Sequence, residues 1–244
     1  MKVFAKSDLG KARDINEDAI YIPEEDLGIN LYILADGMGG YQGGDVASQL
    51  AVTAARSYIK NNYEITFEEK EDILKLVNGS IEYANMVVAE RAKTDKKLNQ
   101  MGSTLEVLLL IRNNAYIGHV GDSRAYIIRD GNIRKLTTDH SYIQKLINDG
   151  RITKAESTNH PDKNMITKAI GTEIVVEAEL IHQKLNKGDI ILLCSDGLTN
   201  LVSDNEILEI IKESFDEDVA EKLVDKANSL GGTDNISVIV LKYN

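Results

Sequence analysis

The middle of the chain alternates short apolar runs with two-residue turn sequences. The pair Asn113-Asn114 separates two runs, and Asp130-Gly131 separates AYIIR from NIRKL. Asp-Gly is a favoured pair for a tight type I′ turn, and runs of this kind joined by tight turns are typical of β-hairpins. Consecutive hairpins mean antiparallel sheet. Strand-like runs occur at Leu31–Ala35, Leu105–Ile111, Ala115–Val120, Ala125–Ile128, Asp189–Cys194 and Ile236–Leu241.

Helical patterns occur in pairs on either side of these hairpins. Apolar residues recur at helical spacing over 45–60, with Asp45 as the expected cap, and over 66–93, which opens on the pattern Thr66-x-x-Glu69. Near the other end, Ser203-x-x-Glu206 opens a third helix, and a fourth stops at Gly231-Gly232. Hairpins between helix pairs predict an α+β fold in which helices cover antiparallel sheets. We expect the polar segment near 141–168 to form a surface flap with one short helix.

Composition limits the organisation and the function. The 244 residues are 43% hydrophobic and 27% charged and contain no linker or repeat, so we expect one domain over 1–244. The formal net charge of -11 argues against a nucleic-acid or anionic-membrane binder. The single cysteine, Cys194, excludes an internal disulfide. With no signal peptide and no membrane-length apolar run, we expect a cytoplasmic protein.

Carboxylates stand repeatedly beside the ends of the apolar runs. Asp36 and Asp196 each follow a run and precede glycine, Asp122 lies between two runs, and Asp234 precedes another. Near the N-terminus, RDINEDA (13–19) adds Glu17 and Asp18. Oxygen ligands without cysteine favour hard cations such as Mg²⁺, Mn²⁺ or Ca²⁺, and paired cations are a usual device for hydrolysing phosphate esters.

Each of these aspartates also has a simpler interpretation. Asp next to Gly commonly marks a turn, and we assign Asp130-Gly131 and Asp149-Gly150 to turns. Asp122 could cap its turn or pair with Arg124. From the residues alone, the pattern therefore predicts a hard-metal site without proving one.

Seven short motifs follow one another along the chain: GKARDINEDA, LADGMGGYQGG, MGSTL, HVGDSRAY, TTDHS, ILLCSDGL and GGTDNISVIV. In these stretches, which span residues 10 to 240, the chain resembles the metal-dependent protein phosphatase family, protein phosphatase type 2C, in its compact bacterial form. The resemblance implies a four-layer α-β-β-α sandwich. It also implies hydrolysis of phosphoserine and phosphothreonine in proteins, with Mn²⁺ or Mg²⁺.

The same resemblance assigns roles to matched positions. Asp36 would bridge two metals, and the Gly37 carbonyl would bind one of them. Asp196 and Asp234 would bind the second. Asp18 and Glu17 would hold metal-bound waters or contact the metal.

The remaining matched positions concern the substrate and a further metal. Arg13 would bind the substrate phosphate through a planar guanidinium fork. Asp122 resembles a ligand of a third, weaker metal of bacterial members, shared with Asp196. The segment at 141–168 matches the family's flap near the substrate cleft.

The implied chemistry is attack on phosphorus by a metal-bridging hydroxide, without a protein nucleophile. Met38 departs from the family, because some members carry a histidine there as a proposed general acid. Nothing marks Cys194 or Ser195 as a nucleophile. We expect His119 and His140 to be structural, with a minor possibility that His160 in the flap approaches substrate.

The leading hypothesis is a protein serine/threonine phosphatase that opposes a bacterial Ser/Thr kinase and acts as a monomer on phosphoproteins. Two alternatives remain. One is a catalytically weak, phosphatase-like binding or regulatory module, which should have lost metal-binding aspartates. The other is a metal-dependent phosphodiesterase, which the acidic composition disfavours.

Overall fold

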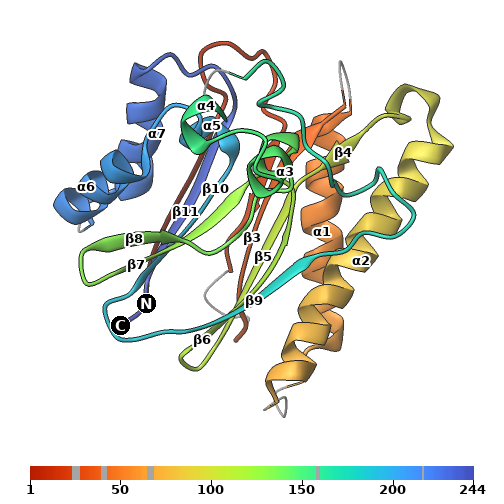
Figure 1. Cartoon of the computed structure of the whole chain (residues 1–244). Coiled ribbons are helices and arrows are strands. Elements are labelled where there is room, and N and C mark those ends of the chain that lie inside the picture. The colour runs from red at the N-terminus through yellow and green to blue at the C-terminus, as the bar shows by residue number, and fades with distance from the viewer. Residues whose placement is uncertain (24–27, 40–42, 65–68, 158–159, 216) are drawn as a thin grey trace.

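Two β-sheets lie face to face between two layers of helices (Figure 1). The structure is a computed structural model that describes residues 1–23, 28–39, 43–64, 69–157, 160–215 and 217–244. The two ends of the chain lie close together, because Lys2 pairs with Lys242 across neighbouring strands. The predicted four-layer α-β-β-α sandwich is confirmed.

Both sheets are antiparallel, as the hairpin pattern predicts. The first contains, in spatial order, β1 (Lys2–Asp8), β11 (Ile236–Lys242), β10 (Ile190–Cys194), β7 (Arg124–Arg129) and β8 (Asn132–Lys135). The second contains β2 (Asp18–Tyr21), β3 (Asn30–Met38), β5 (Leu105–Ile111), β6 (Asn114–Val120) and β9 (Glu179–Lys184), and the short β4 (Gly102–Ser103) pairs with β3. The sequence patterns miss β1 and β9, which interleave polar residues with apolar ones, and the short strands β2 and β4.

The helices cover the outer faces of the two sheets. The long α1 (Gly44–Asn62) and α2 (Lys70–Thr94) pack on the second sheet, and η1 (Lys96–Leu98) follows α2. On the first sheet lie α5 (Asp196–Thr199), α6 (Asp204–Ser214) and α7 (Val219–Ser229). The flap contains α3 (Tyr142–Asn148) and the one-turn α4 (Lys154–Ser157). None of the helices in the described ranges has the length and apolar character needed to cross a membrane.

The core has three layers, which explains why several strands are apolar without alternation. In β3, Leu31, Ile33 and Ala35 pack under α1 and α2, whereas Tyr32 and Leu34 face the other sheet. A strand buried on both faces reads as a continuous apolar run. The same applies to β10, where Cys194 packs against the helices of the first sheet. Its thiol is buried, which raises its pKa and confirms the packing role.

Local signals are confirmed in some places and wrong in others. Asp130 and Gly131 have φ of 50° and 73°, as a type I′ turn requires. The other turn lies one residue earlier than predicted: Arg112 takes φ 55°, and Asn114 already begins β6.

Helix starts show the same mixture. Ser203 and Glu206 form a complete capping box at α6. Asp45 is not the cap of α1, because Gly43 precedes the helix and Asp45 lies in the first turn. A carboxylate there still favours the helix through the N-terminal partial charge. At α2 the predicted cap Thr66 lies outside the described residues, and the helix begins at Lys70.

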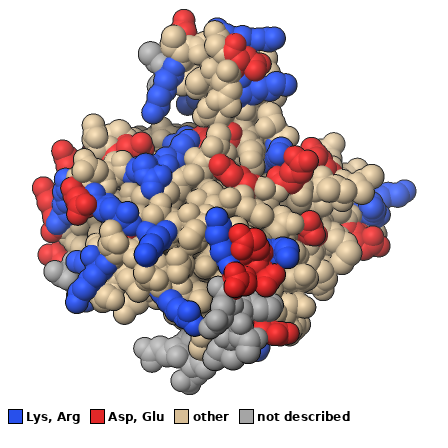
Figure 2. Space-filling view, turned by 60° about the horizontal axis from the view of Figure 1, so that its bottom comes forward, with Lys and Arg blue, Asp and Glu red and all other residues tan. Residues whose placement is uncertain are grey.

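Charges on the surface are mixed. On the face drawn in Figure 2, lysine and arginine are interspersed with aspartate and glutamate and with uncharged residues. This face therefore presents no continuous basic stripe of the kind that a nucleic-acid backbone requires.

Candidate active site

Strand ends from both sheets meet at one edge of the sandwich. Asp36 lies near the end of β3, Asp122 follows β6, Asp196 follows β10, and Asp234 precedes β11. These four side chains line a cleft of about 580 Å³. Other residues that line it include Arg13, Asp14, Glu17, Gly37, Met38, Thr104, Asn164 and Ile166. The structure thus brings together carboxylates that are far apart in the sequence.

Asp18 is placed differently from the other predicted ligands. It stands opposite Asp36 in the β2–β3 ladder but does not line the cleft, and the residue as a whole is 8% exposed. One oxygen, Oδ2, accepts a hydrogen bond of 2.9 Å from Ser195 Oγ. The other, Oδ1, has no hydrogen-bond partner among the described residues. A buried, unpartnered carboxylate oxygen is costly unless a cation or proton satisfies it.

Glycines beside two of the aspartates are required by close backbone approach. A Cβ on Gly37 would lie 2.0 Å from the Gly44 carbonyl oxygen and 2.6 Å from that of Glu17. The Gly37 N–H also donates to the Glu17 carbonyl at 3.0 Å. At Gly197, a Cβ would lie 1.9 Å from the Asn235 carbonyl oxygen. These glycines let the segments around residues 17, 37–44, 197 and 235 approach one another closely at the cleft.

The carboxylates raise one another's pKa. Burial raises the pKa of Asp18 and of Asp122 to about 7, and the charge of Asp196 adds to both shifts. Burial also raises the pKa of Asp36 well above its usual range, with further increases from Asp18 and Asp196. Such a cluster cannot be fully ionised near neutral pH unless positive charge enters it.

Arg13 supplies a cation at the rim of the cleft. Its Nη2 donates to Asp234 Oδ2 at 2.9 Å, and its Nη1 lies 4.0 Å from Glu17 Oε2. Partial burial opposes its charge, but the hydrogen bond and charge of Asp234 outweigh that effect and raise the Arg13 pKa. Arg13 is the one cationic side chain among the described residues that line the cleft.

Several positioning residues lie in the motifs but had no role assigned from the sequence. Asn235 Oδ1 accepts from the Glu17 N–H at 2.8 Å, and its Nδ2 donates to the carbonyls of Leu9 and Ile15. Asn235 thereby fixes the segment that carries Arg13 beside Asp234. The Ser195 hydroxyl accepts a hydrogen bond from the Ser237 N–H and donates one to Asp18. Both bonds hold it against the buried carboxylate, so it is not placed to act as a nucleophile.

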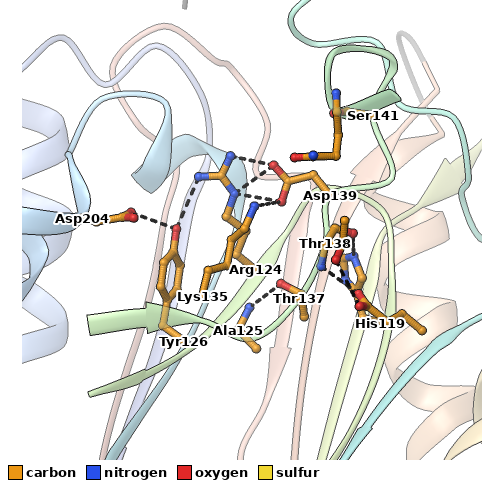
Figure 3. A network of polar contacts seen from close by, with 12 residues as sticks. His119, Arg124, Ala125, Tyr126, Lys135, Thr137, Thr138, Asp139, Ser141 and Asp204 are labelled. Atoms are coloured by element: carbon orange, nitrogen blue, oxygen red, sulfur yellow. Dashed lines mark hydrogen bonds and ion pairs between the residues drawn. The ribbon is translucent and has the colours of Figure 1, made fainter. Parts of the chain in front are cut away.

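The turn that carries Asp122 is held from the base of the flap. Figure 3 shows Arg124 turned toward Asp139, with which it makes three hydrogen bonds of 2.7–3.1 Å, and Lys135 donates to the same carboxylate. Arg124 thus pairs with Asp139, and its positive charge also acts on Asp122, where it opposes the rise of the pKa that burial causes. His140, which follows Asp139 in the chain, forms two hydrogen bonds with Gly121 on the other side of the turn. The His140 N–H donates to the Gly121 carbonyl at 2.7 Å. Its Nδ1 accepts the Gly121 N–H at 3.1 Å.

The histidines are structural where the sequence predicted it. His119 is buried, and its ring nitrogens contact Glu106 and the Thr138 carbonyl. His119, His140 and Glu179 bring ligand atoms within 4.8 Å of one another, but none of the three lines the cleft.

Their bonds also argue against a metal there. Because His140 Nδ1 accepts a hydrogen bond, its neutral ring carries the proton on Nε2, which cannot then bind a metal. Burial lowers the His140 pKa to about 4, so the ring is neutral. His160 Nδ1 accepts from the Asp162 N–H within the flap, and His160 does not line the cleft.

Comparison with known proteins decides the family. The model for "Protein phosphatase 2C" matches residues 11–228. The chain belongs to the protein phosphatase 2C family. The resemblance seen in the sequence motifs is thereby confirmed.

Relatives within the protein phosphatase 2C family cover nearly all of the chain. The serine/threonine phosphatase stp of Listeria monocytogenes is 37% identical over 97% of this chain and 94% of its own length. The crystal structure of the Mycobacterium tuberculosis serine/threonine phosphatase PstP/Ppp matches with a TM-score of 0.90 at 35% identity, covering 100% of this chain and 98% of that one. A second structure, the PstP catalytic domain in complex with two manganese ions, matches with a TM-score of 0.84 at 35% identity, covering 98% of this chain and 96% of that one.

Proposed function

We propose that this chain is a metal-dependent protein phosphatase that removes phosphate from phosphoserine and phosphothreonine in proteins. The observation that carries the proposal is the convergence of Asp36, Asp196 and Asp234 with Arg13 in one cleft. Family membership and the names of the relatives support the same activity. We also propose that residues 1–244 act as one catalytic domain and that the protein is a cytoplasmic monomer opposing a Ser/Thr kinase.

The residues of the cleft fit a pair of hard cations. The donor set is carboxylate and carbonyl oxygen, and the mutual repulsion of the carboxylates favours a cation. Asp18 Oδ1 is also buried with no hydrogen-bond partner in the described part of the chain. Asp36, Asp196 and Asp234, with the Gly37 carbonyl, would hold Mn²⁺ or Mg²⁺, and Asp18 and Glu17 would complete the surroundings. A bound divalent cation supplies positive charge that lowers the pKa of a coordinated water and offsets charge on phosphoryl oxygens.

The chain's own residues would orient the phosphate. Arg13 would turn its guanidinium fork to two phosphoryl oxygens, and its bond to Asp234 holds it at the rim of the cleft beforehand. Met38 lines the cleft but can neither donate nor accept a proton usefully. The leaving oxygen must therefore be protonated by another group.

A pair of small substrates separates this function from its alternatives. We expect hydrolysis of para-nitrophenyl phosphate with Mn²⁺ and little hydrolysis of bis-para-nitrophenyl phosphate. Preference for the diester would indicate a phosphodiesterase. Absence of turnover on either compound, with metal bound, would indicate a binding module.

Replacing Arg13 by Ala should chiefly weaken substrate binding. Loss of one charge-assisted contact corresponds to about 1.5–3 kcal/mol, seen mainly as a raised KM for a phosphopeptide. Steady-state kinetics of wild type and variant measure this change, with Lys11→Ala as a control for a nearby cation outside the cleft lining. Unchanged KM and kcat would remove Arg13 from the site.

Replacing Asp122 by Asn tests the proposed third metal. One or two carboxylates with water make a weak site, so this metal should be needed at higher concentration than the other two. We expect the variant to fold, to keep the two tight metals, and to lose most of its kcat on phosphopeptides. Calorimetric metal binding and kcat against Mn²⁺ concentration measure this. Wild-type kcat with the same Mn²⁺ dependence would refute the role, and lost thermal stability alone would favour a structural role.

A further inference from the structure

A second hollow, of about 310 Å³, lies outside the catalytic cleft. It is formed where the end of α2 and η1 meet the chain that runs from the flap to β9, which passes alongside α2 in Figure 1. Ala89, Ala92, Lys93 and Lys96 line one side, and Thr172 and Ile174 line the other. We call it the α2 pocket.

The α2 side of the pocket follows from helical spacing. Ala92 and Lys93 follow Ala89 by three and four positions, which places these three residues on one face of α2. Lys96 lies beyond the end of α2, at the start of η1. The two alanines are small and leave the hollow open. The two lysines carry long side chains with charged ends and are exposed. On this side the pocket is therefore lined by the small Ala89 and Ala92 and by two lysine side chains that carry ammonium groups.

The opposite side is fixed to α2 and not a loose loop. Asn85 on α2 is 3% exposed, its Oδ1 accepts the Gly171 N–H at 2.7 Å, and its Nδ2 donates to the Glu173 carbonyl at 3.0 Å. Gly171 takes φ 87°, and a Cβ there would lie 2.4 Å from Val88 Cγ1. Such a wall is organised before a ligand arrives, which lowers the entropic cost of binding.

The two lysines outnumber the single carboxylate among the described residues that line the pocket. Within the described ranges neither Lys93 nor Lys96 forms an ion pair, whereas the neighbouring Arg91 pairs with Asp95 at 3.5 Å. Glu173 is the only carboxylate among the described lining residues, and it forms no ion pair with either lysine. In a chain of net charge -11, two unpaired lysines in one hollow provide a local site for an anionic group.

The α2 pocket and the catalytic cleft share a thin wall. A Cβ added to Gly102 would lie 2.8 Å from Met38 Cε and 2.9 Å from Thr172 Cγ2. Met38 lines the catalytic cleft, and Thr172 lines the α2 pocket. A peptide with one residue in the cleft can therefore continue over this wall into the pocket. At its edge, Ile174 and Val175 are 93% and 70% exposed and offer apolar contact to such a chain.

We propose that the α2 pocket is a substrate subsite that takes an anionic side chain flanking the phosphorylated residue in the cleft. The anion is a carboxylate or a second phosphate, held by Lys93 and Lys96. The inference rests on the proposed phosphatase function and adds a substrate class: acidic or multiply phosphorylated segments of proteins.

The test compares phosphothreonine peptides that differ at one position. Each peptide carries a Glu, a Gln or a second phosphothreonine at successive positions on either side of the reacting residue. At one or two positions we expect Glu to raise kcat/KM about fivefold to tenfold over Gln, chiefly through KM, as two partly exposed ion contacts allow. A larger gain from the second phosphothreonine would identify phosphate as the preferred anion, and an equal gain would identify negative charge alone.

Charge reversal then locates the effect. The double variant Lys93→Glu and Lys96→Glu should lose the preference for the anionic peptide while keeping wild-type activity on para-nitrophenyl phosphate. Lys97→Glu is the control, because it reverses one charge in the same region without lining the pocket. It should keep the preference. Melting temperatures of all three proteins check folding.

The outcomes distinguish the two proposals. No turnover of para-nitrophenyl phosphate by the wild type would defeat the phosphatase function itself. Normal turnover of that compound with no Glu preference at any position would overturn the subsite alone. The subsite is also overturned if Lys97→Glu abolishes the preference as fully as the double variant. The preference would then come from the overall surface charge of this region and not from contacts in the pocket.

Discussion

Replacing Asp36 by Asn is expected to lower kcat on a phosphothreonine peptide by about 10³-fold, equivalent to ~4 kcal/mol of transition-state stabilisation. Asp36 stands at the centre of the carboxylate cluster, where Asp18, Asp196, Asp122 and Asp234 all act on its pKa. The amide keeps the shape of the side chain but removes the charge that would hold two cations.

The same substitution should raise the melting temperature of the metal-free protein. Crowded carboxylates repel one another, so replacing one of them by an amide removes a cost that a bound cation or proton otherwise offsets. Scanning calorimetry in EDTA measures this change. Asp130→Asn, at an exposed hairpin turn that tolerates Asn, is the control and should leave kcat unchanged. A variant at Asp36 with kcat within tenfold of wild type would remove this residue from the centre of the site.

Replacing Gly197 by Ala is expected to destabilise the fold by about 3 kcal/mol and to lower activity as well. The added Cβ would lie 1.9 Å from the Asn235 carbonyl oxygen, so backbone must move. The segments that must separate carry Asp196 on one side and Asp234 on the other. Denaturant unfolding and kcat, measured on the same preparation, report the two effects.

Gly188→Ala is the control for backbone conformation without a clash. Gly188 takes φ 92°, but a Cβ there meets nothing within 4 Å, so only the conformational strain of about 1 kcal/mol is expected. Equal losses of stability in the two variants would mean that close approach at Gly197 is unimportant. An unchanged kcat in Gly197→Ala would mean that the separation of Asp196 and Asp234 tolerates the shift.

The sequence predicts those strands that are buried on both faces and misses those that are not. The run at 31–35 is recognisable because Leu34 faces the other sheet while Ile33 faces the helices. β9 has no such run, since His182 and Gln183 interrupt it at the edge of the sheet. The position of the turn is predicted correctly at Asp130-Gly131, where both residues have positive φ. The other turn lies one residue earlier than predicted, because Arg112 adopts positive φ there.

The sequence predicts which residues form the site, but it does not predict how deeply each of them is buried. Strand-end position identifies Asp36, Asp122, Asp196 and Asp234, because strand ends gather at one edge of a sheet. The burial of Asp18 behind the cleft depends on Ser195 and Ser237, which come from segments far away in the chain. The sequence motif contains Asn235 but does not indicate its role. Its three hydrogen bonds to the segment near Arg13 form only when the two ends of the chain come together.

The most direct test of the proposed function is hydrolysis of a phosphothreonine peptide before and after complete removal of divalent metal. We expect the metal-free protein to lose all measurable turnover and to recover it when Mn²⁺ is added, with Mg²⁺ at best equally effective, because the ligands are hard oxygens. Full turnover by the metal-free protein, verified by elemental analysis, would contradict a metal-dependent phosphatase.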